Sequence, residues 1–322
     1  MKVVVTGATG FIGSCLIWKL NQMGIEDIIA VDVAKIPDEC HNILRKKYSK
    51  YIDREKFLES VKKNTLEIDI DMVIHFGACS STTETDVEYL TNNNFLYSKE
   101  LGEWCLRNKK RYLYASSAAT YGAGNDGYSD DDLLVSRLAP LNEYGRSKQK
   151  FDMWVIDNGL QREFVGFKFF NVYGPNEYHK GDMRSMVNKG YHQIKETGKI
   201  CLFKSYRQDY KDGEQKRDFI YVKDAIDMVI YFIENPDKCG IYNIGTGQAR
   251  TWNDLADALF KALNIDANIE YIDMPPQIRE QYQYFTEADM DKLKGSGCPC
   301  NITDIYDAVA DYVGYLEEKT YL

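Results

Sequence analysis

A tyrosine and a lysine stand four residues apart in the stretch YGRSKQKFD, at Tyr144 and Lys148. Side chains at this spacing lie on the same face of a helix, about 5–6 Å apart at Cβ. The pKa of a tyrosine is ordinarily about 10, and a neighbouring cation lowers it by favouring the phenolate. The pair is therefore a candidate general base, Tyr144, tuned by Lys148. An isolated pair of this kind is more often a surface contact on a helix, so its interpretation depends on the rest of the chain.

Ser117 ends a predicted strand in the stretch YASSAATYG, just before the helix that carries Tyr144. In doubly wound sheets, ligands bind at the carboxyl ends of the strands. Ser117 can therefore hydrogen-bond a substrate hydroxyl beside Tyr144 and Lys148. A serine, a tyrosine and a lysine next to a nicotinamide form a hydride-transfer site in which the tyrosine takes the alcohol proton.

Three glycines, Gly7, Gly10 and Gly13, separate the first predicted strand from the first predicted helix. They allow a tight turn, a close approach of backbone to a pyrophosphate, and a helix N-terminus aimed at its charge. An acid, Asp32, ends the next strand, which completes the context for dinucleotide binding. Asp32 would bind the adenosine ribose and favours NAD, but basic residues that could offset a 2′-phosphate follow at Lys35, Arg45, Lys46, Lys47, Arg54 and Lys56. The alternative for these residues is a solvated loop, and the choice between NAD and NADP stays open.

Five apolar stretches that read as strands alternate with helical patterns; they lie within 2–7, 27–32, 71–78, 111–122 and 163–174. This alternation predicts an α/β fold, a Rossmann-type doubly wound parallel sheet. A smaller, partly interleaved α/β substrate domain is expected to complete it. We assign 1–171 plus 218–247 to the dinucleotide-binding domain and 172–217 plus 248–322 to the substrate domain. Residues 204–216 are expected to form a polar loop, and Thr251 with Asp254 a helix capping box.

The composition is that of an ordinary globular protein, with 44% hydrophobic and 28% charged residues and a formal net charge of -9. That charge argues against nucleic acid or an anionic membrane as the main partner. No apolar run is long enough to cross a bilayer, and the N-terminal stretch lacks the apolar core of a signal peptide. The eight cysteines are scattered, which favours reduced thiols in the cytoplasm. Cys298 and Cys300 have no matching pair at zinc spacing, so no metal site is predicted.

Several longer stretches resemble the extended short-chain dehydrogenase/reductase superfamily and, within it, the ADP-L-glycero-D-manno-heptose 6-epimerases. They are GACSSTTETD (77–86), NNNFLYSKEL (92–101), YASSAATYG (114–122), FNVYGPNEYHKGDMRS (170–185) and QYQYFTEAD (281–289). The resemblance implies inversion of C6 of an ADP-linked heptose through a 6-keto intermediate, by reversible hydride transfer to bound NADP. It also implies a homo-oligomer, a pentamer. The oxygen of the ketone lies away from Tyr144 once it has turned, and the family supplies a second acid/base, here Lys180.

The resemblance also carries over binding residues. With the glycines and Asp32, the implied cofactor contacts are Gly7, Gly10, Phe11, Ile12, Gly13, Asp32, Arg54, Phe76, Gly77, Ala78, Cys79, Ser80, Asn93, Lys148, Val172 and Lys180. The implied substrate contacts are Ser117, Asn171, Asp182, Lys189, Phe203, Lys204, Ser205, Arg217 and Tyr282. Arg217 is reasonable on chemical grounds too, because a guanidinium matches phosphate oxygens.

The chain departs from the family pattern around the predicted substrate pocket. Phe76 stands where a glutamate is common, Asp182 where a serine is usual, and Lys189 where a histidine is usual. The segment 204–216 is also longer, so the nucleotide-sugar stays open. A 4-epimerase or a reductase of the same fold is the alternative. A 4,6-dehydratase lacks its acid, since Ala118 and Ala119 follow Ser117, and a module that only binds the dinucleotide would not need the Ser/Tyr/Lys set.

Overall fold

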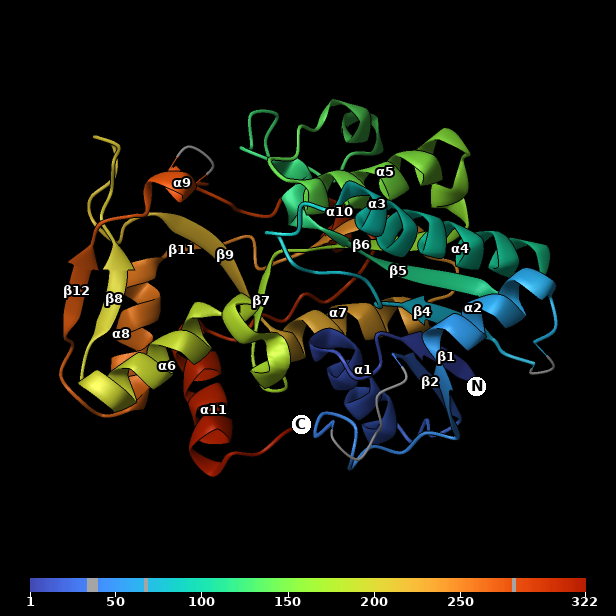
Figure 1. Ribbon diagram of the computed structural model, residues 1–322, viewed down its shortest axis with the longest axis horizontal. Coiled ribbons are helices and arrows are strands. Elements are labelled where there is room, and N and C mark those ends of the chain that lie inside the picture. Colours follow the sequence, from blue (N-terminus) through green and yellow to red (C-terminus); the bar gives the residue numbers. More distant parts are fainter. Residues whose placement is uncertain (34–39, 67–68, 280–281) are drawn as a thin grey trace.

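A seven-stranded parallel sheet forms the larger part of the computed structural model, which describes residues 1–33, 40–66, 69–279 and 282–322 (Figure 1). Its strand order is β10-β6-β5-β4-β1-β2-β3. The strands are β1 (Val3–Thr6), β2 (Ile28–Asp32), β3 (Lys50–Asp53), β4 (Met72–His75), β5 (Arg111–Ser117), β6 (Phe164–Phe169) and β10 (Gly240–Ile244). The strand order reverses between β1 and β4, which is the position where doubly wound sheets bind dinucleotides.

The central strands are apolar on both faces because helices cover both sides of the sheet. β1 pairs in parallel with β2 and β4, with Val3 opposite both Ile28 and Met72. This register brings the carboxyl ends of the three strands, Thr6, Asp32 and His75, to one edge. The site must therefore lie at this edge.

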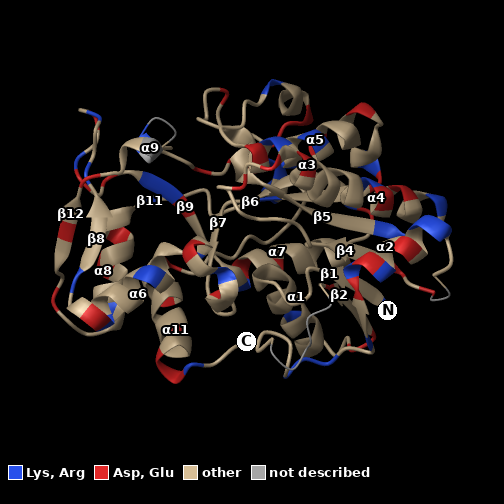
Figure 2. Cartoon of the chain, viewed as in Figure 1, with Lys and Arg blue, Asp and Glu red and all other residues tan. Residues whose placement is uncertain are grey.

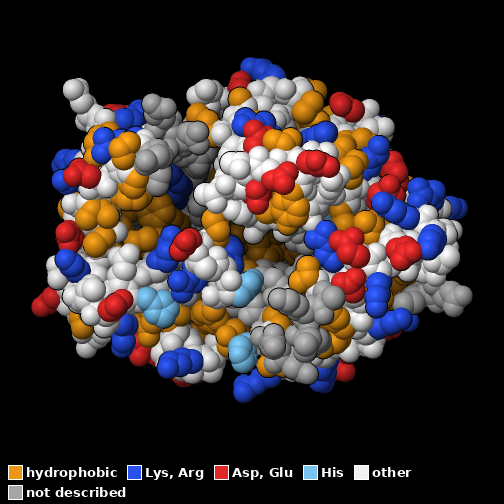
Figure 3. Space-filling view, viewed as in Figure 1, with side chains coloured by type: hydrophobic (Ala, Val, Ile, Leu, Met, Phe, Trp, Pro, Cys, Tyr) orange, Lys and Arg blue, Asp and Glu red, His pale blue; other side chains and the backbone are white. Residues whose placement is uncertain are grey.

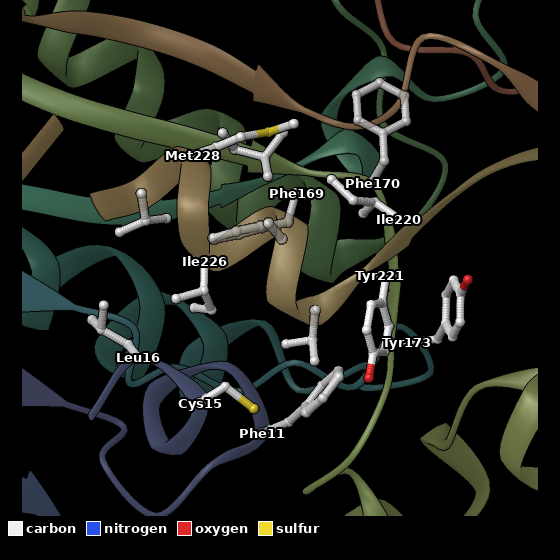
Figure 4. Close-up of a cluster of buried hydrophobic side chains, with 14 of the residues drawn as sticks. Phe11, Cys15, Leu16, Phe169, Phe170, Tyr173, Ile220, Tyr221, Ile226 and Met228 are labelled. Atoms are coloured by element: carbon white, nitrogen blue, oxygen red, sulfur yellow. The ribbon is translucent and has the colours of Figure 1, made fainter. Parts of the chain in front are cut away.

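Helices form one layer on each face. In Figure 1, α1 (Phe11–Gln22) and α7 (Val222–Glu234) lie below the sheet, and α4 (Tyr97–Arg107) and α5 (Glu143–Asp157) lie above it. α2 (Arg54–Lys63) packs beside α4. The two faces have separate cores, and Figure 4 shows the lower one, where Leu16 and Ile226 lie with Phe169. The two cores fix α1 and α5, the helices that bring the predicted residues to the edge.

Two small sheets lie beside the large one (Figure 1). One joins β7 (Asn171–Tyr173), β9 (Lys216–Tyr221) and β11 (Ala249–Thr251), and the other joins β8 (Ile200–Phe203) and β12 (Ile269–Ile272). Around them pack α6 (Met186–Thr197), α8 (Trp252–Ala262) and α11 (Ile305–Glu318). The stretch 163–174 was expected to be one strand, but it forms β6 in the large sheet and β7 in the three-stranded sheet. It therefore links the large sheet to the three-stranded one. The proposed domain boundaries stay a prediction.

The remaining helices are short. Among the described residues they are α3 (Val87–Leu90), a π-helical turn at Thr91–Leu96, α9 (Pro276–Arg279), α10 (Asp291–Gly295) and the 3-10 helices Ala118–Tyr121, Asp132–Arg137, Leu160–Arg162 and Tyr178–Met183. The capping box of Thr251 and Asp254 is confirmed at the start of α8. The fold class is confirmed as well, but the solvated loop considered for the basic residues that follow Asp32 is wrong in part, because β3 and α2 lie there. Within the described residues, the helices are all too short or too polar to span a bilayer.

Candidate active site

A cavity of about 1700 Å³ lies where the carboxyl edge of the large sheet meets the two small sheets. Figure 3 shows hydrophobic side chains inside a hollow near the middle of this face, with basic side chains around it. Typical pockets for one small ligand occupy about 300–1,000 Å³. The cavity is therefore large enough for two ligands side by side.

The glycine turn after β1 forms one end of the cavity. Gly7 has a φ of +68°, and a Cβ there would lie 2.6 Å from the Gly77 nitrogen. A Cβ on Gly13 would collide with the Gly7 carbonyl oxygen. Gly10 is the N-cap residue of α1, and it has no side chain that could accept from the backbone N–H groups of the first turn. These N–H groups therefore remain available to a ligand in the cavity. Phe11 and Ile12 line the cavity beside them. This cradle fits the pyrophosphate of a dinucleotide.

Asp32 lines the cavity at the end of β2, but its carboxylate already has protein donors. One oxygen accepts hydrogen bonds from the Thr9 N–H at 2.9 Å and the Thr9 hydroxyl at 2.7 Å, and the other accepts from the Val33 N–H at 2.8 Å. Sequence reasoning missed Thr9, whose position inside the glycine turn was the available signal. These donors partly offset the negative charge that Asp32 would present to a 2′-phosphate.

The basic residues that follow Asp32 differ in whether their side chains reach the cavity. Arg54 begins α2 and lines the cavity, with its guanidinium 5.3 Å from the centre of the Tyr97 ring and 2.9 Å from Glu55. Lys46 is buried and donates to the carbonyl of Leu322, while Lys47 pairs with Glu26 at 2.5 Å. Arg45 and Lys56 are exposed and do not line the cavity, and Lys35 lies outside the described residues. Arg54 is thus the described cation of this set that faces the cavity.

The segment after β4 lines the dinucleotide side with Phe76, Gly77, Ala78, Cys79 and Ser80. Buried side chains hold it in place. The Thr6 hydroxyl accepts from the Gly77 N–H at 3.1 Å and contacts His75 Nδ1 at 2.6 Å. Burial lowers the pKa of His75 to about 3, so this histidine stays neutral.

Asn94 joins the segment after β4 to α5 through hydrogen bonds. Its amide accepts from the Cys79 N–H at 2.8 Å and donates to the Cys79 carbonyl at 3.0 Å and to the Ser147 hydroxyl at 3.0 Å. Sequence reasoning predicted its neighbour Asn93, which lines the cavity, but missed Asn94. Both lie in the π-helical turn, a geometry frequent at functional sites, yet the spacing of the sequence does not reveal it.

Tyr144, Lys148 and Ser117 come together at the cavity as predicted. Asn142 caps α5 by accepting from the Gly145 N–H at 2.8 Å, which sets the first turn that carries Tyr144. Lys148 is buried and donates to the Ala115 carbonyl at 2.9 Å. Burial lowers the pKa of Lys148 to about 8.

The expected lowering of the tyrosine pKa by Lys148 is wrong for this structure. Burial raises the pKa of Tyr144 above its usual value, and the hydroxyl of Ser117 is the group that opposes the rise. The ammonium of Lys148 is directed instead to a β5 carbonyl. Tyr144 therefore rests as a neutral phenol, and a positive charge placed beside it would favour the phenolate, which is the form that acts as a base.

A buried ion pair lies behind these residues. The Lys168 ammonium on β6 donates to the Asp152 carboxylate on α5 at 2.7 Å, and both side chains are at most 1% exposed. Asp152 also accepts from the Tyr114 hydroxyl at 3.0 Å and the Ser116 hydroxyl at 2.6 Å. Asp152 follows Tyr144 by two helical turns on α5. It therefore joins α5 to β6 through Lys168, and to the end of β5, which carries Ser117, through Ser116.

Lys180 enters the cavity from the segment after β7. Its ammonium lies 5.4 Å from the centre of the Phe11 ring, and burial lowers its pKa. Tyr144 comes from α5 on one face of the large sheet, while Phe11 begins α1 on the other. Asn171 and Val172 on β7 line the cavity nearby, and so does Lys189 on α6.

The far end of the cavity is aromatic and basic. Arg217, on the basic start of β9 (Figure 2), is 6% exposed and donates to the carbonyls of Lys216 and Gln283. Its guanidinium carbon lies 5.1 Å from the ring centre of Tyr282 and 5.8 Å from that of Trp252. Phe203 packs edge-on to Tyr282 at 6.3 Å.

Three predicted substrate contacts do not line the cavity. The side chain of Asp182 is exposed, Lys204 pairs with Asp273 at 3.5 Å, and the Ser205 hydroxyl donates to the Arg207 carbonyl at 3.0 Å. Their roles stay predictions. In their place the cavity is lined by Arg184, which sequence reasoning missed because it lies in a loop with no periodic signal.

Comparison with known proteins agrees with this geometry. Residues 3–245 match the NAD dependent epimerase/dehydratase family. The chain is 51% identical to the ADP-L-glycero-D-manno-heptose-6-epimerase of Nitratidesulfovibrio vulgaris (strain DP4), over 96% of each chain. It is 47% identical to that of Fusobacterium nucleatum subsp. nucleatum, over 99% of this chain and all of the other.

Solved structures give the same picture. The crystal structure of the Helicobacter pylori ADP-L-glycero-D-manno-heptose-6-epimerase has a TM-score of 0.79 at 26% identity and covers 98% of this chain and 96% of that one. A UDP-glucuronic acid 4-epimerase from Bacillus cereus has a TM-score of 0.78 at 23% identity, covering 99% of this chain and all of that one, a likeness of fold. The chain therefore belongs to the NAD dependent epimerase/dehydratase family and, within it, to the group of the ADP-L-glycero-D-manno-heptose-6-epimerases.

Proposed function

We propose that the protein inverts C6 of an ADP-linked manno-heptose, with NADP as its bound cofactor. The observation that carries this proposal is the placement of Tyr144 and Lys180. Both can move protons, both line one cavity, and they come from elements associated with opposite faces of the large sheet. An epimerase has to handle the oxygen of its substrate in two orientations, and two separated proton-transfer groups meet that need.

Each residue at the site is proposed to have a separate role in the reaction. When bound in the cradle of Gly7, Gly10 and Gly13, the dinucleotide would supply a reversible hydride acceptor for C6. Tyr144 in its phenolate form takes the proton of the C6 hydroxyl, and Ser117, whose hydroxyl contacts the Tyr144 side chain, holds that oxygen in line. Lys148 keeps its ammonium on the carbonyl of Ala115, from where it would hold the ribose of the nicotinamide. Lys180 gives or takes the proton once the oxygen has turned, and its lowered pKa makes the neutral amine easier to reach.

The polar half of the cavity suits a nucleoside diphosphate. Arg184, Lys189 and Arg217 bring three cations to its lining, and phosphate oxygens are matched by guanidinium groups. Phe203 and Tyr282 offer aromatic faces beside Arg217 for a flat base. The same chemistry would accept other nucleotide-sugars, so a 4-epimerase or a reductase of this fold is the second candidate. The homo-oligomer, a pentamer, and the cytoplasmic location stay predictions.

Arg54 is expected to decide between NADP and NAD. Asp32 already accepts three hydrogen bonds, so it repels a 2′-phosphate less than a free carboxylate would. Arg54→Gln should weaken NADP by about tenfold or more, the value of a lost charge-assisted hydrogen bond. Release of the bound cofactor by heat, followed by its identification, measures the ratio of NADP to NAD. Lys56→Gln, exposed on the same helix, is the matched control. A native protein that retains NAD alone would contradict the proposal.

The test of the function itself is the fate of the hydrogen at C6. That hydrogen is not next to a carbonyl in the substrate, so no side chain of ordinary pKa can remove it as a proton. Epimerisation of the ADP-heptose in deuterium oxide should therefore leave C6 free of deuterium, with no net change in nicotinamide absorbance over many turnovers. A reductase would consume its cofactor, and a 4-epimerase would leave C6 untouched. Deuterium entering C6 in step with product would rule the mechanism out.

A further inference from the structure

The residues on either side of Lys180 are joined by one buried carboxylate. Lys180 lies in a short surface segment, residues 178–184, called here the Lys180 segment. Glu177 precedes the segment and Ser185 follows it. The Glu177 carboxylate accepts from the Ser185 N–H at 2.6 Å and from the Ser185 hydroxyl at 2.5 Å. These two bonds close the segment into a loop whose ends are held at one point.

The segment has further bonds of its own. The Lys180 N–H donates to the Glu177 carbonyl at 3.0 Å. Arg184 Nε donates to the carbonyl of Gly181 at 2.8 Å, and Gly181 has a φ of +54° that favours glycine at this turn. The backbone that carries Lys180 is thus held directly against the residue whose side chain closes the loop.

The base of the segment is fastened to the dinucleotide helix. Asn176, next to Glu177, is fully buried and donates to the Ser14 hydroxyl on α1 at 3.0 Å. Its carbonyl accepts from Asn42 at 2.9 Å. Lys180 lies over Phe11, which begins the same helix. The contacts that hold the Lys180 segment on α1 therefore also set the position of Lys180 relative to the pyrophosphate cradle.

Closing this loop with a carboxylate needs an explanation, because a neutral side chain would cost less free energy to bury. Glu177 is 0% exposed, and burying a carboxylate is costly unless its oxygens are hydrogen-bonded and its charge is offset. Burial raises the pKa of Glu177, and the hydrogen bonds from Ser185, with a smaller contribution from the positive charge of Lys180, oppose that rise. The relation is mutual, because the charge of Glu177 also favours the ammonium form of Lys180. A carboxylate is thus matched to both the loop and the lysine.

We propose that Glu177 is a positioning residue for Lys180: its side chain closes the Lys180 segment on Ser185 and thereby sets where the ammonium lies above Phe11. The inference rests on the proposed function, in which Lys180 is the second proton-transfer group. Ser185 shares the task, since it also begins α6 as the cap that accepts from the Asn188 N–H at 3.3 Å.

The test is a double-mutant cycle between Glu177 and Lys180. Glu177→Gln keeps the shape of the side chain and removes its charge, and kcat should fall by about 10²-fold, the cost of a catalytic group misplaced by about 1 Å. In a Lys180→Met background the same change should lower kcat no further, because the residue acts through that lysine. Ser185→Ala removes one of the two donors and should give a smaller loss that is likewise absent in the Lys180→Met background. If Glu177→Gln does not fold, Ser185→Ala tests the same inference.

Asp224 provides a matched control. It is a buried carboxylate on α7 that accepts from the N–H and hydroxyl of Thr303, each at 2.8 Å, and does not line the cavity. Asp224→Asn should lower thermal stability as Glu177→Gln does, with kcat unchanged. Native turnover in Glu177→Gln, or an equal loss with and without Lys180, would overturn the inference while leaving the proposed function intact. Native turnover in Lys180→Met would instead overturn the role of Lys180 in the proposed function, leaving Tyr144 alone, and the inference with it.

Discussion

Replacing Tyr144 by phenylalanine and Lys180 by methionine is expected to lower kcat by about 10²–10⁴-fold in each case, the usual contribution of a positioned proton transfer. The reason is the separation of the two groups. Tyr144 lies beside Ser117 at the end of β5, and Lys180 lies over Phe11, so neither side chain can take over the work of the other. Initial rates with saturating ADP-heptose, together with the amount of retained cofactor, measure the effect.

Two matched variants control for loss of a phenol and loss of an ammonium. Tyr191 on α6 donates to Glu317 at 2.9 Å, and Lys195 on the same helix pairs with Glu317 at 3.0 Å. Neither lines the cavity, so Tyr191→Phe and Lys195→Met should keep native turnover. A Lys180→Met enzyme with near-native turnover would leave a mechanism that uses Tyr144 alone.

The large sheet and the dinucleotide end of the site could be predicted because their signals are local. Continuous apolar strands indicate a parallel sheet. The glycines at 7 and 13 stand where a Cβ would collide with backbone, and a Cβ on Gly10 would lie 3.1 Å from the Gly7 carbonyl oxygen. The trio of Ser117, Tyr144 and Lys148 follows from the same logic, since a strand end and the next helix meet at one edge.

Other features depend on contacts between distant parts of the chain. β3 is short and polar, and only its pairing with β2 makes it a strand. Asn94 bonds both Cys79 and Ser147, residues far from it in sequence. The direction of the Tyr144 pKa was misjudged because helical spacing places Lys148 nearby but does not say that its ammonium donates to Ala115.

The substrate end was the least predictable part. Its residues come from β7, β8, β9, α6 and the segments between them, so no single spacing describes it. Trp252 lines the cavity without belonging to any stretch that carried the resemblance to the family. Arg184 lies within 170–185, a stretch that did carry it, but the resemblance assigned no role to this residue. Conversely, Lys204 and Ser205 belong to a loop that bonds to itself and to Asp273.

The ion pair of Asp152 and Lys168 is expected to be the most sensitive point of the fold near the site. Removing one partner leaves an unpaired buried charge, so Lys168→Met or Asp152→Asn should each lower the free energy of unfolding by about 3–5 kcal/mol. The double variant Asp152→Asn/Lys168→Met should lose much less than the sum, because no charge is left unpaired. Urea titration followed by circular dichroism measures these differences, and Lys63→Met, at an exposed pair with Glu59, should leave stability unchanged.

The same experiment shows what the pair contributes to catalysis. If it only stabilises the fold, the double variant should regain both stability and turnover. Asp152 also accepts from Ser116, next to Ser117, and lies on the helix of Tyr144, so the pair sets the distance between the two catalytic groups. We therefore expect the double variant to recover most of its stability while its kcat stays low. Full recovery of kcat with stability would show that packing of α5 on β5 places Tyr144 without help from the charges.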